Sequence, residues 1–240
     1  MKQALIFAAG LGERMRPLTN TTPKPLLHVG GKPLIVWHLE QLQRLGVQTV
    51  VVNTSWLADQ FPSTLGDGSQ WNLQLRFSQE PYPPLETGGG MLNAWRQLDP
   101  HEPLLAVNGD VWTDYDFTGL ATIGRDTLAH LVMVDNPSHN ANGDFALNGQ
   151  QLESDGDERH TFSGLGIYRY ELFEGWNDHV TFDLAADDLP RFKLAPLLRK
   201  AMHAGRVSGE LHRGRWTDVG TPERLALLDR ELSGDGLGLR

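Results

Sequence analysis

Glycine and cationic residues gather directly after the first apolar run of the chain. That run, ALIFAA, shows no polar/apolar alternation, which is typical of a strand buried on both faces. Gly10 and Gly12 follow it, and glycines let backbone N–H groups approach phosphate oxygens without a side chain in the way. Arg14, Arg16 and Lys24 bring positive charge to the same region. The stretch predicts a polyphosphate site at the carboxyl end of a strand, where open α/β sheets bind ligands.

The spacing of these residues excludes two familiar phosphate loops. A dinucleotide-binding fingerprint needs a third glycine where Met15 stands, and no Gly-Lys-Ser/Thr follows at the spacing of a Walker A loop. A plain strand-to-helix turn is the alternative interpretation of the two glycines. Prolines on both sides of Lys24 predict an extended segment that keeps this lysine out of a helix.

A later buried run is followed by a carboxylate that could reach this loop. Asp110 comes two residues after the run LLAVN at 104–108, and the carboxyl ends of neighbouring parallel strands share one edge of a sheet. A carboxylate there can hold Mg²⁺ against phosphate oxygens. A turn residue without a ligand is the alternative role for Asp110.

Three consecutive glycines at 88–90 precede a helix that the sequence predicts over 91–98. Each glycine costs a helix about 1 kcal/mol of propensity, so their presence indicates that something needs close access to the backbone. A flexible loop is the alternative.

Composition limits the classes of partner. The 240 residues carry a net charge of −9 and no long Lys/Arg run, which disfavours nucleic acid and anionic membranes. The absence of cysteine excludes disulfides and thiolate metal sites. The first strand begins almost at once, leaving no room for a signal peptide, and no apolar run reaches membrane-spanning length, so we expect a globular cytoplasmic chain.

Strands and helices alternate along most of the chain, which predicts a mainly parallel sheet. Further strands are expected over 47–53, 73–77, 128–135 and 207–212, and further helices over 33–45, 56–65, 116–123, 192–204 and from 224. Short segments at 144–147, 151–153 and 161–168 predict hairpins of a smaller lobe. The acidic stretch 177–191 reads as a solvated loop or a mobile cover, and the last seven residues as disordered.

The motif GxGxRMxPLT at 10–19, with PKP at 23–25, resembles the signature of the sugar-1-phosphate nucleotidyltransferases. This resemblance, which covers about 4–232, implies an α/β Rossmann-like nucleotidyltransferase fold. Helices would flank a mainly parallel, twisted central sheet, with a smaller β-rich sugar-binding lobe. One domain would span 1–240, with a nucleotide-binding part at about 1–135 plus 205–232 and the sugar-binding lobe at about 136–204.

The resemblance also implies roles for individual residues. Arg14 and Lys24 would be catalytic, and Mg²⁺ would be bound by Asp110 and by Asp218 of the WTDVGTP motif, where a turn residue ahead of the helix cap Thr221 is the alternative. The implied nucleotide-binding residues are Ala8, Gly10, Leu11, Gly12, Glu13, Glu86, Thr87, Gly88 and Asn108. The implied sugar-binding residues are Gly143, Asp144, Glu153, Ser163 and Gly164, although Glu153 also suits a solvated turn.

Within the family, the motifs ETGGG at 86–90, VNGDVWTDYD at 107–116 and VDNP at 134–137 most resemble one branch. Its members transfer a uridylyl group from UTP to N-acetylmuramate 1-phosphate, releasing pyrophosphate, in cell-wall recycling. Guanylyl, thymidylyl or uridylyl transfer to mannose or glucose 1-phosphate is the nearest alternative.

Two alternatives come from other classes. A non-catalytic nucleotide-sugar sensor could lack the lysine or one of the metal-binding aspartates. Lys24, Asp110 and Asp218 are all present, which favours an enzyme. A glycosyltransferase would carry an Asp-x-Asp motif, and the one at 114–116 is better explained as an exposed turn. The lactyl carboxylate of N-acetylmuramate would need a hydrogen-bond donor, for which Arg159, Lys193 and Arg199 are candidates. The sequence predicts no oligomeric state.

Overall fold

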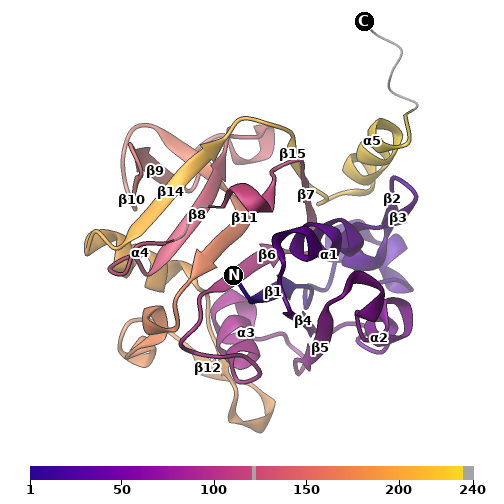
Figure 1. The fold of residues 1–240 in the computed structure, drawn as a ribbon, viewed down its shortest axis with the longest axis horizontal. Coiled ribbons are helices and arrows are strands. Elements are labelled where there is room, and N and C mark those ends of the chain that lie inside the picture. The colour runs from indigo at the N-terminus through magenta and orange to yellow at the C-terminus, as the bar shows by residue number, and fades with distance from the viewer. Residues whose placement is uncertain (121–122, 235–240) are drawn as a thin grey trace, which may run out of the picture.

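A nine-stranded mixed sheet forms the centre of the computed structural model, which describes residues 1–120 and 123–234 (Figure 1). Its strand order is β5-β4-β1-β6-β11-β8-β14-β10-β9. These strands are β1 (Gln3–Phe7), β4 (Thr49–Thr54), β5 (Gln74–Gln79), β6 (Leu104–Asn108), β8 (Ala129–Val134), β9 (Phe145–Asn148), β10 (Gln151–Glu153), β11 (Arg159–Tyr168) and β14 (Val207–His212). Three two-stranded ribbons accompany it: β2 (His28–Val29) with β3 (Lys32–Pro33), β7 (Val111–Thr113) with β15 (Trp216–Asp218), and β12 (Asp183–Leu184) with β13 (Pro190–Arg191).

The first half of the sheet is parallel, as the alternation of strands and helices predicts. β1 lies between β4 and β6, so that Leu5 is opposite both Val51 and Ala106. These three side chains are buried, which explains the uninterrupted apolar runs. Because the strands start in register, they also end together, and the loops after β1 and β6 meet at one edge.

The second half of the sheet adds a reversed strand. β11 runs antiparallel to both β6 and β8, with an irregularity between Phe162 and Leu165, and β14 then pairs in parallel with β8. The hairpin of β9 and β10 continues from β14 to the sheet edge. The short strands expected over 144–168 therefore extend the central sheet, and the predicted α/β class is confirmed.

The described residues contain five α-helices: α1 (Leu34–Leu45), α2 (Gln60–Leu65), α3 (Glu86–Trp95), α4 (Ala195–His203) and α5 (Pro222–Leu232). Local signals explain several ends. α1 stops where Gly46 adopts φ 80° and donates its N–H to Gln43, and α5 starts where the Thr221 hydroxyl accepts from the Arg224 N–H. Figure 1 shows α5 beside the β2–β3 ribbon, away from the main sheet.

Three predicted helices differ from the structure. The helix expected over 56–65 is shorter, since α2 begins at Gln60, and the helix expected from Met91 begins at Glu86, so that the three glycines lie inside it. The helix expected over 116–123 is a single 3₁₀ turn, Phe117–Gly119, capped by Asp116, whose carboxylate accepts from the Thr118 N–H. Residues 121–122 of that prediction, and 235–240 of the predicted disordered tail, lie outside the described residues.

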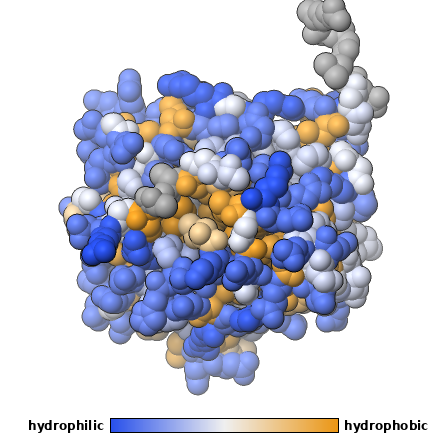
Figure 2. All heavy atoms as spheres, viewed as in Figure 1, coloured by the Kyte–Doolittle hydropathy of each residue, from blue (hydrophilic) through white to orange (hydrophobic). Residues whose placement is uncertain are grey.

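Hydrophilic residues cover most of the face shown in Figure 2, and the apolar residues visible there lie mainly toward its middle. The described residues contain no helix long and apolar enough to cross a membrane.

Candidate active site

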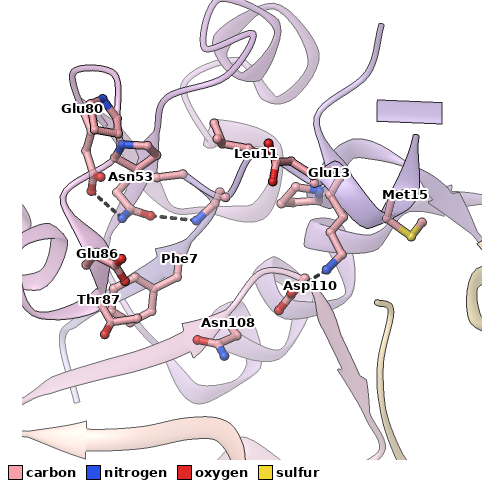
Figure 3. Close-up of a pocket in the computed structure, with 18 of the residues that line it drawn as sticks. Phe7, Leu11, Glu13, Met15, Asn53, Glu80, Glu86, Thr87, Asn108 and Asp110 are labelled. Carbon is pink, nitrogen blue, oxygen red and sulfur yellow. Dashed lines mark hydrogen bonds and ion pairs between the residues drawn. The ribbon is translucent and has the colours of Figure 1, made fainter. Parts of the chain in front are cut away.

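A cavity of about 700 Å³ lies at the carboxyl ends of β1 and β6 (Figure 3). It brings together most of the residues predicted for catalysis and nucleotide binding. They are Ala8, Gly10, Leu11, Gly12, Glu13, Arg14, Lys24, Glu86, Thr87, Asn108 and Asp110. Arg16, which the sequence also offered as positive charge for the phosphates, does not line the cavity. Its guanidinium lies 4.0 Å from the Glu13 carboxylate.

The glycine loop is held in shape by Thr19. Gly12 adopts φ 64°, and the Thr19 hydroxyl donates to the Gly12 carbonyl at 2.7 Å. A Cβ atom on Gly12 would come within 2.8 Å of the Thr19 side chain, so the position requires glycine for both reasons. Gly10, in contrast, is exposed at the cavity, and no atom of the described residues lies within 4 Å of where its Cβ would be.

Lys24 pairs directly with Asp110 at the floor of the cavity. Its Nζ lies 2.6 Å from the Asp110 carboxylate, and the lysine is only 9% exposed. The predicted extended conformation is wrong, because Lys24 begins a 3₁₀ turn, Lys24–Leu26. Pro23 is extended and the Leu27 N–H bonds back to the Lys24 carbonyl, so the turn aims the lysine at the strand tip.

Asp218 reaches the same region through the β7–β15 ribbon. Asp218 is paired with Val111, and the Val219 N–H donates to the Asp110 carbonyl at 2.8 Å. Its carboxylate is bound by the Arg224 guanidinium and by His139 Nε2, the latter at 2.9 Å. Asp218 itself is not among the cavity-lining residues, although Gly220, two positions later, is.

These two aspartates are the residues that could hold a metal ion. The described residues contain no group of three or more His, Asp or Glu side chains arranged for a metal. Mg²⁺ does not need one, since it is commonly bound through one or two carboxylates, with water and substrate phosphates completing its octahedron. Asp110, in the turn between β6 and β7, and Asp218, at the end of β15, supply two carboxylates of the kind that this requirement needs.

The glycines of α3 are explained by the chain's own packing. The Gly88 and Gly89 N–H groups donate to the Phe192 carbonyl at 2.9 and 3.1 Å, and a Cβ on Gly89 would lie 2.2 Å from the Pro190 carbonyl oxygen. The expectation that something needs close access to this backbone is confirmed, and that something is the 190–192 segment. Gly88, predicted to lie beside a bound base, packs against Phe192 and does not line the cavity.

Two buried residues that the sequence analysis missed link both sides of the cavity (Figure 3). Asn53 accepts from the Ala8 N–H at 2.7 Å and donates to Glu80 at 2.7 Å, and Glu80 accepts from the Leu85 N–H at 2.8 Å. Burial raises the pKa of Glu80, opposed by these two hydrogen bonds. Both side chains end parallel strands, so the argument that selected Asp110 could have selected them.

The predicted sugar-binding residues are mostly away from this cavity. Gly164 packs on Asn108, whose side chain lies 2.6 Å from where a Cβ would be, and Ser163 precedes it in the bulged part of β11. Asp144 bonds the Phe162 N–H at 2.8 Å, Gly143 precedes Asp144, and Glu153 is exposed on β10. Only Gly164 touches a cavity-lining residue directly in these contacts.

The other polar candidates also have structural partners. Arg159 donates to the Asp144 carbonyl at 2.5 Å, and the Arg199 guanidinium lies 5.4 Å from the centre of the Phe145 ring. Neither of them lines the cavity, and neither does Lys193. Asp114 of the Asp-x-Asp motif bonds His212 at 2.8 Å, which agrees with an exposed turn.

A glycine loop that meets a lysine and a carboxylate at the ends of parallel strands defines a nucleotide-binding α/β protein. The chain belongs to the nucleotidyl transferase family, whose model matches residues 3–145.

Curated relatives extend the similarity over nearly the whole chain. An N-acetylmuramate alpha-1-phosphate uridylyltransferase from Neisseria meningitidis is 47% identical over 230 residues, covering 93% of this chain and 95% of its own. A protein of the same name from Caulobacter vibrioides is 31% identical, covering 92% and 93%. Among solved structures, HddC from Yersinia pseudotuberculosis, complexed with GMP-PN, aligns with a TM-score of 0.73 at 21% identity, covering 96% of this chain and 99% of that one.

Proposed function

We propose that this protein transfers a uridylyl group from UTP to N-acetylmuramate 1-phosphate, forming UDP-N-acetylmuramate and pyrophosphate. The observation that carries the proposal is the cavity in which the glycine loop faces the Lys24–Asp110 pair. The 47% identity to the N-acetylmuramate alpha-1-phosphate uridylyltransferase of Neisseria meningitidis supports the choice of substrates.

The reaction needs no nucleophile from the protein. A phosphate oxygen of the sugar 1-phosphate attacks the α-phosphorus of UTP, a new P–O bond forms, and the bond from the α-phosphorus to the bridging oxygen breaks as pyrophosphate leaves. The protein therefore has to bring two anions together, align them and offset the charge that gathers in the transition state.

The cations of the cavity suit this task. Lys24 would stabilise the α-phosphoryl group, for which its buried, oriented ammonium is prepared in advance. Arg14 and the Gly10–Gly12 backbone would hold the β- and γ-phosphates that leave. Asp110 holds the Lys24 ammonium in place before the substrates arrive.

Mg²⁺ is the proposed cofactor, and Asp110 and Asp218 would hold it. When bound, it would supply positive charge to the phosphate oxygens. The Arg224 guanidinium and His139 hold the Asp218 carboxylate in the meantime. Each predicted metal ligand is thus oriented by a neighbouring side chain, Asp110 by Lys24 and Asp218 by Arg224.

The division of labour along the chain is also part of the proposal. The nucleotide would be bound by about 1–135 with 205–232, and the sugar by about 136–204, with Gly143, Asp144, Glu153, Ser163 and Gly164 lining its pocket. We assign the reaction to peptidoglycan recycling in the cytoplasm, where UTP is available to the enzyme.

Pyrophosphate release with Mg²⁺ tests the proposal. UTP, dTTP and GTP would each be combined with the 1-phosphates of N-acetylmuramate, N-acetylglucosamine, glucose and mannose. We expect fastest release with UTP and N-acetylmuramate 1-phosphate, and none when either substrate is omitted. Preference for another pair would reassign the substrates, and no release with any pair would favour a nucleotide-sugar sensor.

A further inference from the structure

The segment that ends in β13 brings a third cation into the cavity. Arg191 lines the cavity together with Glu86 and Thr87, although it comes from the acidic stretch for which the sequence predicted only a loop or a cover. Its guanidinium donates to Asp183 across the β12–β13 ribbon, through Nε at 3.2 Å and through the adjacent nitrogen. The arginine side chain remains 32% exposed, so part of its donor fork is accessible.

Four hydrogen bonds fix this segment on the start of α3. The Phe192 N–H donates to the Leu85 carbonyl at 3.2 Å, and the Phe192 carbonyl accepts from Gly88 and Gly89. The Leu194 N–H donates to the Thr87 hydroxyl oxygen at 3.1 Å. Gly88 and Gly89 allow this close approach because they have no side chain that would collide with the 190–192 segment. Arg191 is thus placed by the residues that follow it in the chain.

The same bonds use up backbone donors at this end of the cavity. The N–H groups of Gly88 and Gly89 are engaged by Phe192, and that of Leu85 by Glu80. The Arg191 guanidinium also lines the cavity, and it is a side-chain donor for a base bound beside Glu86 and Thr87. Its hydrogen bond and ion pair with Asp183, and more weakly the charge of Glu86, raise the pKa of Arg191, so it stays a donor.

We propose that Arg191 and Glu86 together select the base, accepting a pyrimidine that presents a carbonyl oxygen beside an N–H. Arg191 would donate to the O4 atom of uracil, and the Glu86 carboxylate would accept from N3–H. Cytosine reverses this pattern, because it presents an amino group at position 4 and an unprotonated N3. With cytosine, the Arg191 donors would face the amino group and the Glu86 carboxylate would face the unprotonated N3. Donor would then meet donor and acceptor would meet acceptor, so these groups would be left unpaired in the complex.

This inference rests on the proposed nucleotide end of the cavity and deepens the proposed function. Its test compares the wild-type protein with Arg191→Ala and Lys193→Ala. Lys193 is the matched control, because it is a cation two residues away that is exposed and does not line the cavity. Circular dichroism and thermal melting establish that the variants are folded, which we expect since the Arg191–Asp183 pair is largely exposed.

Two readouts are measured for each protein: binding of UTP and CTP with Mg²⁺ by calorimetry, and kcat/KM for each nucleotide with N-acetylmuramate 1-phosphate. We expect Arg191→Ala to reduce the preference for UTP over CTP about 10- to 100-fold, mainly by weakening UTP, while KM for the sugar phosphate is unchanged. Arg191→Lys keeps the charge without the planar fork and should recover only part of the preference. Lys193→Ala should keep the wild-type preference for UTP over CTP.

An unchanged UTP/CTP preference in Arg191→Ala would overturn the inference, as would an increase confined to the KM of the sugar phosphate, which would place Arg191 at the acceptor. The calorimetric arm separates the two claims. A wild-type protein that prefers UTP through Arg191 but releases no pyrophosphate would contradict the proposed reaction alone, whereas absent UTP binding would contradict both.

Discussion

At the scale of single residues, the Lys24–Asp110 pair is the feature on which the chemistry depends. Asp110 could be predicted from its place after a buried strand, because parallel strands in register end together. The conformation of Lys24 could not, since the preference against a turn before Pro25 is weaker than the packing that buries the lysine. Local preferences at a site are commonly overridden in this way.

Removing the Lys24 charge should reduce turnover without unfolding the protein. We expect Lys24→Ala to lower kcat/KM about 100- to 1,000-fold, since one oriented charge at the transition state contributes about 3 kcal/mol. Lys32→Ala is the control, because Lys32 also forms an ion pair, with Glu40 at 2.5 Å, but lies outside the cavity lining. Lys24→Ala with more than a tenth of wild-type activity would contradict the role assigned to the lysine.

The Asn53 side chain should matter for both stability and nucleotide binding. Asn53→Ala leaves the Ala8 N–H and one Glu80 oxygen without their partner, and such losses cost about 1–3 kcal/mol. Urea denaturation should show this loss, and KM for UTP should rise because the glycine loop is no longer tied to the start of α3. Exposed Asn148 offers a control in Asn148→Ala. Equal stability of both variants would argue against the bridge.

At the scale of elements, the triple glycine of α3 shows how far sequence reasoning extends. Helix propensity indicated correctly that the backbone is approached closely, but it could not identify the approaching group. The 190–192 segment is about a hundred residues away in the chain, and its contact depends on the tertiary fold. Local sequence carries no signal for such a contact.

Gly89→Ala should therefore destabilise the protein although alanine favours helices. The new Cβ would lie 2.2 Å from the Pro190 carbonyl oxygen, and relieving such overlap costs about 1–3 kcal/mol, against about 1 kcal/mol gained in propensity. Thermal denaturation would compare it with Gly119→Ala, where no atom of the described residues lies within 4 Å of the added Cβ. A melting temperature of Gly89→Ala at or above the wild type would refute the packing argument.

The contact between α1 and β7 should make stability fall in mild acid. His38 is buried, its Nε2 lies 2.9 Å from the Val111 carbonyl oxygen, and burial lowers its pKa to about 4. Between that value and the ordinary pKa of 6.5 the unfolded chain binds the extra proton, so stability declines as pH falls through this window.

From pH 7 to pH 5 this histidine should cost about 2 kcal/mol of unfolding free energy. His38→Gln keeps an N–H donor without a titrating ring, so its pH dependence over this range should be shallower by that amount. Parallel denaturation curves for both proteins at the two pH values would show instead that His38 does not titrate differently on folding.

At the scale of the whole molecule, the α/β class and the chain positions of the main strands could be predicted, because apolar runs and periodicity specify buried strands and amphipathic helices. The merging of the 144–168 strands into one sheet could not, since pairing of β11 with β6 and β8 is non-local. The sequence predicted that the glycine loop, Lys24 and Asp110 share a site, but it did not predict Arg191, because that contact is also non-local. Asp110 follows the end of a strand that the sequence predicts, whereas Arg191 enters the cavity from the β12–β13 ribbon, which it does not predict.

The most direct test of the account is the identity of the product. The purified protein would be incubated with Mg²⁺, UTP and N-acetylmuramate 1-phosphate, and the mixture analysed by mass spectrometry together with a pyrophosphate assay. We expect UDP-N-acetylmuramate and pyrophosphate in equal amounts, and about 100- to 1,000-fold slower formation of both by Lys24→Ala. Unchanged substrates, or UTP hydrolysed without a sugar nucleotide, would contradict it.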